Sequence, residues 1–261
     1  MLRYELSGRG SPVLVLLHEL GGSLESFDGL MPQLEAHFRV LRYDQRGAGG
    51  SEKPRLPFSM ADHADDLDQL VTALGLPTPL FLAGVAAGAA IAVAYALDAP
   101  QAVAALALCA PALTVERDRV DYLAARSELA VTEGMAAIVD GSLERSYPLI
   151  MQRDPATYAA YRSRFLANDP VGYAHANLAL AHVQLEPRLE ELRQPCLLLA
   201  GTHDLLRPPQ TVAPLAARIG HGSFDVIDSG HLMPVQAPEE MGRQLVNFFA
   251  AARRNALVRA S

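Results

Sequence analysis

The feature that most constrains this chain is a short stretch bracketed by glycines, GVAAG, at residues 84–88. An apolar run at residues 79–83 precedes it, and an alanine-rich run follows it as far as residue 97. This order predicts a buried strand, a tight turn and a helix. Small residues are needed at Gly84 and Gly88 because larger side chains would collide where the chain reverses so sharply.

The turn has the spacing of a nucleophile elbow, Gly-x-Ser-x-Gly, whose middle residue stands exposed above a sheet on a strained backbone. In this chain the middle residue is Ala86. The sequence therefore predicts the backbone of an elbow without the hydroxyl group of a serine nucleophile.

Strand patterns alternate with helix patterns on both sides of the middle of the chain. The continuous apolar runs at residues 13–17 and 103–109 are typical of strands that are covered on both faces, and residues 195–200 form a similar run. The alternation predicts an α/β fold with a mostly parallel central sheet and right-handed crossovers. Cys109 ends one strand and Cys196 begins another, so we expect two buried thiols that cannot approach closely enough for a disulfide.

The alternation stops after residue 111. Residues 114–191 are more charged, contain tyrosines and lack a clear buried strand, which predicts several helices. We therefore predict an α/β core formed by residues 1–111 and 192–261, with a helical cap inserted at residues 112–191. The polar cap side chains that are candidates to face a substrate are Tyr122, Arg126, Tyr147, Tyr158, Tyr161, Arg162, His175 and His182.

Two helices are predicted in the core on either side of the cap. One spans residues 26–36, and the other closes the chain at residues 238–252, followed by a tail at residues 253–261 that we expect to fray. A third helix, marked by an apolar stripe around Leu70, carries aspartates at positions 62, 65, 66 and 68. We interpret these aspartates as a solvated helix face and not as metal ligands.

Polar side chains follow several of the predicted strands. In an open parallel sheet, ligands bind beyond the carboxyl ends of the strands. His18 and Glu19, the turn at Ala86, Asp204 and His231 all occupy such positions. The chain order of elbow, aspartate and histidine is that of the catalytic triad that uses this elbow, which predicts that Asp204 and His231 act together.

Four motifs extend this pattern across nearly the whole chain: HELGG at residues 18–22, YDQRGAGGS at 43–51, GTHD at 201–204 and GH at 230–231. Together they resemble the oxyanion loop, the Asp-x-Arg-Gly-x-Gly-x-Ser stretch, the acid loop and the catalytic histidine of the α/β-hydrolase fold superfamily. The chain is most similar to the branch of 3-oxoadipate enol-lactonases, small bacterial esterases and C–C hydrolases.

The resemblance implies roles for individual residues. His231 would move the proton, Asp204 would hold its tautomer, and the backbone N–H groups of Leu20 and Ala87 would form the oxyanion hole. Glu19 stands where the family commonly has glycine, so it is either a second acid/base group or a carboxylate that pairs with an arginine such as Arg46 or faces solvent.

Three functional hypotheses follow from these residues. The first is an enzyme that hydrolyses an ester, a lactone or a C–C bond of a small carbonyl compound, with Ala86 at the nucleophile position through engineering or natural loss. The second is a natural lyase, decarboxylase or isomerase that uses the dyad of His231 and Asp204 and needs no cofactor. The third is a non-catalytic protein that binds a small ligand.

The composition of the chain argues against some classes of binding partner and indicates its cellular environment. The net charge of −7 argues against nucleic acid and anionic membrane surfaces as partners, and no apolar run is long enough for a membrane span. No secretory leader is recognised, and both cysteines lie in apolar runs, so we expect a reduced, cytoplasmic environment. We predict a small-molecule substrate, no metal and no organic cofactor, and the oligomeric state is left open.

Overall fold

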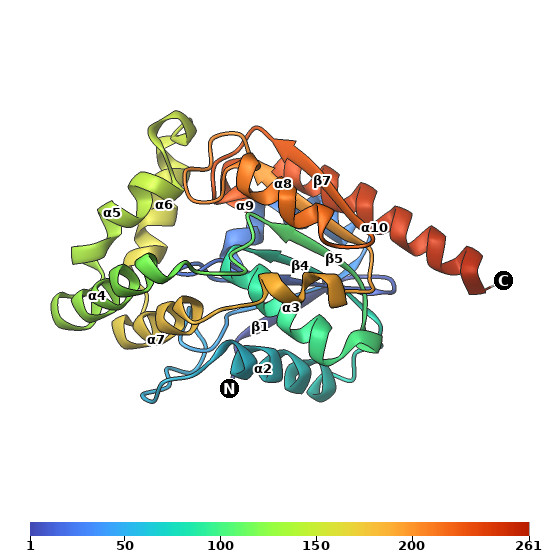
Figure 1. The fold of residues 1–261 in the computed structure, drawn as a ribbon, viewed down its shortest axis with the longest axis horizontal. Helices are drawn as coiled ribbons and strands as arrows, with labels where there is room; N and C mark the ends of the chain where they lie inside the picture. Colours follow the sequence, from blue (N-terminus) through green and yellow to red (C-terminus); the bar gives the residue numbers. More distant parts are fainter. Residues whose placement is uncertain (261) are drawn as a thin grey trace.

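The structure, a computed structural model, describes residues 1–260. Its centre is a seven-stranded sheet with the order β1-β3-β2-β4-β5-β6-β7 (Figure 1). The strands are β1 (Tyr4–Gly8), β2 (Val13–Leu17), β3 (Arg39–Tyr43), β4 (Leu80–Val85), β5 (Val103–Cys109), β6 (Cys196–Gly201) and β7 (Gly222–Ile227). Strand β1 is antiparallel to β3, and all other neighbours are parallel. The predicted α/β fold with a mostly parallel sheet is confirmed.

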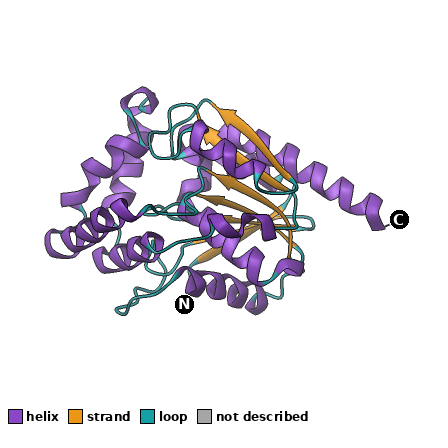
Figure 2. Ribbon diagram, in the orientation of Figure 1, coloured by secondary structure: helices purple, strands orange, loops and turns teal. Residues whose placement is uncertain are grey.

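Helices cover both faces of this sheet (Figure 2). Helices α2, α3 and α8 share one hydrophobic cluster with the sheet, and η1, α1, α9 and α10 share another. The helices outside the predicted cap are η1 (Leu24–Leu30), α1 (Met31–Glu35), α2 (Met60–Ala73), α3 (Ala87–Asp98), η2 (Pro100–Ala102), α8 (Pro209–Ala217), α9 (Met233–Gln236) and α10 (Pro238–Ala260). The short helix η4 (Glu186–Glu191) lies within the predicted bounds of the cap but packs through Leu189 into the first of these clusters. Among residues 1–260, no helix is long and apolar enough to cross a membrane.

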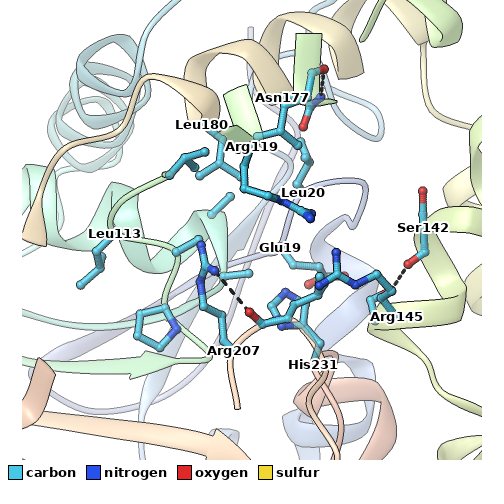
Figure 3. Close-up of a pocket in the computed structure, with 18 of the residues that line it drawn as sticks. Glu19, Leu20, Leu113, Arg119, Ser142, Arg145, Asn177, Leu180, Arg207 and His231 are labelled. Carbon is cyan, nitrogen blue, oxygen red and sulfur yellow. Dashed lines mark hydrogen bonds between the residues drawn. The ribbon is translucent and has the colours of Figure 1, made fainter. Parts of the chain in front are cut away.

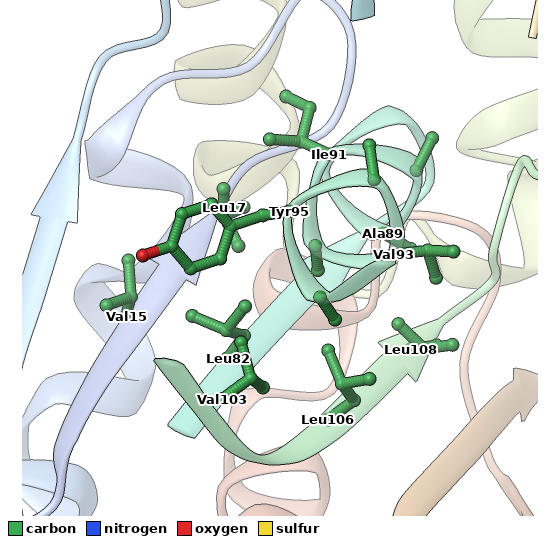
Figure 4. Packing of buried hydrophobic residues seen from close by; sticks show 14 of the residues in the cluster. Val15, Leu17, Leu82, Ala89, Ile91, Val93, Tyr95, Val103, Leu106 and Leu108 are labelled. Carbon is green, nitrogen blue, oxygen red and sulfur yellow. The ribbon is translucent and has the colours of Figure 1, made fainter. Parts of the chain in front are cut away.

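Strand β2 is apolar at every position because both of its faces are covered. Val15 and Leu17 pack toward α3 in one cluster, together with Leu82 of β4 (Figure 4). Leu14 and Leu16 belong to the cluster on the opposite face. Since side chains alternate between the faces of a strand and helices cover both faces, every position of β2 must be apolar.

The cysteines lie where the predicted layout places them. Strands β5 and β6 are parallel neighbours, with Cys109 opposite Leu199 and Cys196 opposite Leu106. Both thiols are free and buried, and burial raises the pKa of each to about 12. They are therefore unreactive core residues.

A separate group of helices lies beside the carboxyl ends of the strands, at the left of Figure 1. These helices are α4 (Arg117–Glu133), α5 (Ala136–Ser146), η3 (Leu149–Met151), α6 (Pro155–Leu166) and α7 (Pro170–Ala181). They share a hydrophobic cluster of their own that includes Leu143, Phe165 and Tyr173. All of them fall within the predicted cap at residues 112–191, and the division of the chain into core and cap stays a prediction.

One predicted helix is present in two pieces, and the predicted end of another is wrong. Residues 26–36 form part of the 3₁₀ helix η1 and then α1, because Pro32 is suited to the first turn of a new helix and supplies no N–H for a continuous one. The tail expected to fray at residues 253–261 instead continues α10 to residue 260, because no glycine or proline stops that helix. Ser261 lies outside the described residues.

Candidate active site

The turn between β4 and α3 has the sharp geometry that its glycines predict. Ala86 has φ 50° and ψ −108°, a conformation that L residues rarely adopt. A Cβ atom on Gly84 would lie 2.4 Å from the carbonyl oxygen of Gly88, and one on Gly88 would lie 2.1 Å from the carbonyl oxygen of Leu17. Only glycine fits at either position, and the turn places Ala86 at the wall of a cavity.

Two loops at the ends of β6 and β7 bring Asp204 and His231 together. His231 Nδ1 lies 2.9 Å from Asp204 Oδ2. The second carboxylate oxygen, Oδ1, accepts hydrogen bonds from the backbone N–H groups of Leu206 (2.7 Å) and Arg207 (2.9 Å). The arrangement leaves Nε2, the other ring nitrogen of His231, free of the carboxylate.

The ionisation of Asp204 follows from these contacts. Burial alone would raise its pKa, but the charge and hydrogen bond of His231 and the two backbone donors hold the pKa of Asp204 below its ordinary value. Asp204 is therefore an ionised acceptor at neutral pH, able to fix the imidazole orientation and to stabilise an imidazolium.

The loop after β2 is held by His18. Its Nε2 accepts a hydrogen bond from the backbone N–H of Gln45 (3.1 Å), so Nδ1 carries the proton and donates to the carbonyl oxygen of Glu19 (2.8 Å). The amide side chain of Gln45 donates in turn to the His18 carbonyl oxygen (2.7 Å). His18 therefore fixes the loop and uses both ring nitrogens to do so.

Glu19 is buried at the cavity wall, with 1% of its surface exposed. Its Oε1 accepts hydrogen bonds from the hydroxyl groups of Ser26 (2.8 Å) and Tyr161 (2.9 Å). Within the described part of the chain, Oε2 is buried and has no hydrogen-bond partner. Burial and the adjacent Glu19 raise the pKa of Tyr161 well above its ordinary value, so Tyr161 is a neutral donor.

The suggested pairing of Glu19 with Arg46 is wrong, as is its exposure to solvent. Arg46 makes a two-pronged contact with Asp66 at 2.6 and 2.7 Å, and its guanidinium lies over the ring of Phe58. The helix that carries Asp66 packs beside the Arg46 loop, and this competing carboxylate takes the arginine. Glu19 instead uses neutral hydroxyl donors from the core and from α6.

A cavity of about 500 Å³ joins these groups. Its wall includes all of the predicted site residues except Asp204, which lies behind His231: Glu19, Leu20, Ala86, Ala87 and His231. The Leu20 N–H has no acceptor in the described part of the chain, and Ala87 is the first residue of α3, where a backbone N–H lacks a partner within the helix. Both amides therefore suit an oxygen atom bound in the cavity.

The residues that the cap contributes to the cavity were predicted less well than those of the core. Of the eight cap candidates, Tyr122, Arg126 and Tyr161 line the cavity, whereas the other five do not. Among the lining residues that were not predicted from the sequence are three arginines, Arg119, Arg145 and Arg207, which are labelled with Glu19 and His231 in Figure 3. Only Arg207 had a detectable signal, because it lies three residues after Asp204 in the acid loop.

The sheet, the turn after β4 and the aspartate–histidine pair define an α/β-hydrolase fold. A family model described as the alpha/beta hydrolase fold matches residues 12–238, and the chain belongs to this family. This result confirms the resemblance inferred from the sequence motifs.

Individual relatives are named hydrolases. The chain is 31% identical to a protein from Enterobacter cloacae named as a putative carbamate hydrolase, RutD, with 93% of this chain and 92% of the relative covered. The structure of the enol-lactonase from Burkholderia xenovorans matches with a TM-score of 0.90 and 30% identity, covering 95% of this chain and 96% of that one. A thermophilic esterase from Thermogutta terrifontis matches with a TM-score of 0.91 and 28% identity, covering 96% of this chain and 93% of that one.

Proposed function

We propose that this enzyme acts on a small carbonyl compound by proton transfer, without an acyl-enzyme intermediate at position 86. His231 is the general base, Asp204 orients it, and Glu19 is a second acid/base group in the same cavity. The methyl group of Ala86 cannot attack a carbonyl carbon, so a substrate proton or a water molecule is the target of the base.

The observation that carries this proposal is the placement of Glu19. Burying a carboxyl group is costly unless it is hydrogen-bonded, and Ser26 and Tyr161 supply two donors to Oε1. A Cβ atom on Gly22 would lie 2.2 Å from Glu19 Oε1, so the loop is built around this side chain. The other oxygen, Oε2, is buried and has no hydrogen-bond partner among the described residues, so it is the oxygen left to carry a proton.

The backbone amides complete the chemistry. Removing a proton beside a carbonyl group places negative charge on the carbonyl oxygen, as does attack by water. The N–H groups of Leu20 and Ala87 can stabilise that charge in either case. Reactions open to this site are therefore enolisation, decarboxylation, C–C cleavage and water-mediated hydrolysis.

A second candidate is a hydrolase that lacks only its serine hydroxyl. The backbone at Ala86 favours it, since a φ of 50° is strained for alanine and is the conformation that displays a nucleophile. On this hypothesis Ala86→Ser restores an acyl-enzyme burst with p-nitrophenyl acetate, and His231→Ala in the same variant removes the burst.

The test of the proton-transfer function is deuterium exchange beside a ketone. Levulinate and its methyl ester are incubated in D₂O with the enzyme, and loss of the C3 proton signal is followed by NMR. We expect exchange about 10²-fold or more above buffer, abolished in His231→Ala and reduced at least tenfold in Glu19→Gln at an unchanged melting temperature. His203→Ala is the matched control, because His203 lies beside Asp204 in sequence but contacts Asp228 outside the cavity, at 3.2 Å.

The outcomes separate the two candidates. Exchange no faster than in buffer, together with an esterase burst in Ala86→Ser, would reject proton transfer and favour the hydrolase. Glu19→Gln that retains full exchange would remove Glu19 from the mechanism and leave His231 as the base.

A further inference from the structure

The cavity is lined by four arginines that come from three separate segments. Arg119 and Arg126 lie on α4, Arg145 lies on α5, and Arg207 follows β6. Among the described side chains, none of the four lies within 4 Å of a carboxylate. Arginines such as Arg42, Arg46 and Arg218 are ion-paired, whereas these four line one cavity without a carboxylate partner.

The observed partners of these arginines are neutral. Arg207 donates to the carbonyl oxygens of Leu206 (3.2 Å) and Thr114 (3.3 Å), and Arg145 donates to the carbonyl oxygen of Leu205 (3.3 Å). These bonds orient the guanidinium groups without cancelling their charge.

Arg126 differs from the other three because it is committed to side chains of the cap. It donates to the hydroxyl groups of Ser142 and Tyr173, the latter at 2.5 Å. We therefore assign Arg126 to the cap's own packing and consider Arg119, Arg145 and Arg207 as the binding groups.

Carboxylates at the cavity wall do not neutralise these three groups by direct contact. Glu186 is paired with Arg218 at 3.2 Å, Glu116 is exposed, and Glu19 is held by hydroxyl groups. Burial lowers the pKa of Arg207, and the positive charges of Arg119 and Arg145 lower it further against the opposing effects of Asp204 and Glu116. Arg119 and Arg145 are thus close enough to Arg207 for their charges to repel its guanidinium group, and a bound anion would relieve that repulsion.

We infer that Arg119, Arg145 and Arg207 form a binding site for an anionic group, a carboxylate or a phosphate, on the substrate of this enzyme. The inference rests on the proposed function for the reacting end of that substrate. Guanidinium forks match the geometry of both anions. The backbone N–H of Arg207 bonds to Asp204, so the anion site lies one loop away from His231. A cavity of about 500 Å³ then holds a small molecule with a carbonyl group at one end and a negative charge at the other.

Matched probes test the charge directly. Levulinate and methyl levulinate share a ketone and a carbon skeleton and differ by one negative charge. Using isothermal titration calorimetry on the full chain, we expect levulinate to bind at least tenfold more tightly than its methyl ester. Raising the salt concentration should reduce this preference, because ions screen the attraction.

Substitutions locate the site. Arg119→Gln and Arg207→Gln should each weaken levulinate binding about tenfold and leave methyl levulinate unaffected, whereas Arg207→Lys, which keeps the charge, should retain part of the affinity. Arg162→Gln is the matched control, because Arg162 is a cap arginine paired with Asp140 outside the cavity, at 2.9 Å. Melting temperatures identify any variant that fails to fold, and for such a variant the lysine substitution gives the result.

Competition distinguishes the two anions. Inorganic phosphate that displaces levulinate at a lower concentration than acetate does would favour a phosphate-bearing substrate, and the reverse order a carboxylate. Glu19→Gln should keep or strengthen anion binding even where proton transfer is lost, so failure of the proposed function leaves this measurement intact. Equal binding of levulinate and its ester, or no binding of either levulinate or phosphate, would overturn the inference.

Discussion

The two walls of the cavity are built differently. On the sheet side, Ala86, Asp204 and His231 stand on short loops at strand ends, and backbone hydrogen bonds fix those loops. On the cap side, Arg119 and Arg145 project from helices. We propose a division of labour, in which the sheet side holds the reacting groups and Arg207 at fixed positions and the cap helices contribute Arg119 and Arg145 to the selection of the substrate.

The two walls also differ in how closely their backbones are packed. The sheet-side turn brings backbone against backbone, as at Gly88, where an added Cβ atom would meet the carbonyl oxygen of Leu17 at 2.1 Å. In cap helix α5, an added Cβ atom on Gly141 would meet nothing within 4 Å. The comparison predicts opposite effects for the same substitution on the two walls.

The largest effect is expected for Gly88→Ala. The new methyl group cannot be accommodated without moving β2 or α3, which should lower the free energy of unfolding by about 3 kcal/mol or more. Urea unfolding followed by circular dichroism measures the change. A variant of wild-type stability would show that the sheet-side wall is more deformable than its contacts indicate.

Asp204→Asn tests whether the charge of Asp204 stabilises the sheet side, because that contribution depends on pH. The pKa of an aspartate in an unfolded chain is about 3.9, and that of folded Asp204 is lower, so ionised Asp204 stabilises the fold above about pH 4 and this contribution is lost as the pH falls through the folded value. We expect Asp204→Asn to lower the free energy of unfolding by about 1–3 kcal/mol at pH 7.

The same variant gives a pH signature. The difference in unfolding free energy between wild type and Asp204→Asn should shrink when both proteins are measured at about pH 3, below the pKa of an unfolded aspartate. A difference that stays constant between neutral and acidic pH would contradict a stabilising effect of the charge on Asp204.

The smallest effect, with the opposite sign, is expected for Gly141→Ala. The substitution adds a better helix former in open space, and it should raise the free energy of unfolding by about 0.5–1 kcal/mol. Thermal unfolding of Gly141→Ala beside Gly88→Ala gives a direct comparison. Loss of stability in Gly141→Ala would show that the cap is packed as tightly as the sheet side.

The same contrast explains what the sequence could predict. The alternation of strands and helices, the elbow turn and the pair of Asp204 and His231 were predictable because each depends on local patterns, either apolar runs or turn residues at strand ends. The topology of a parallel sheet then brings these ends together without further information.

The cap residues were not predictable in this way. Arg119 is preceded by Arg117 on the same helix, and nothing local shows that Arg119 faces the cavity. Which face of α4 is covered depends on the placement of the cap over the sheet. The hydrogen bond between Tyr161 and Glu19 likewise joins residues 142 positions apart, a separation at which sequence periodicity carries no signal.

The strained turn at Ala86 also has an evolutionary consequence. Every alanine codon becomes a serine codon through a single base change, and the backbone at this position already has the conformation that would present a hydroxyl group to the cavity. A lineage carrying this chain can therefore gain or lose a side-chain oxygen at position 86 without rebuilding the turn.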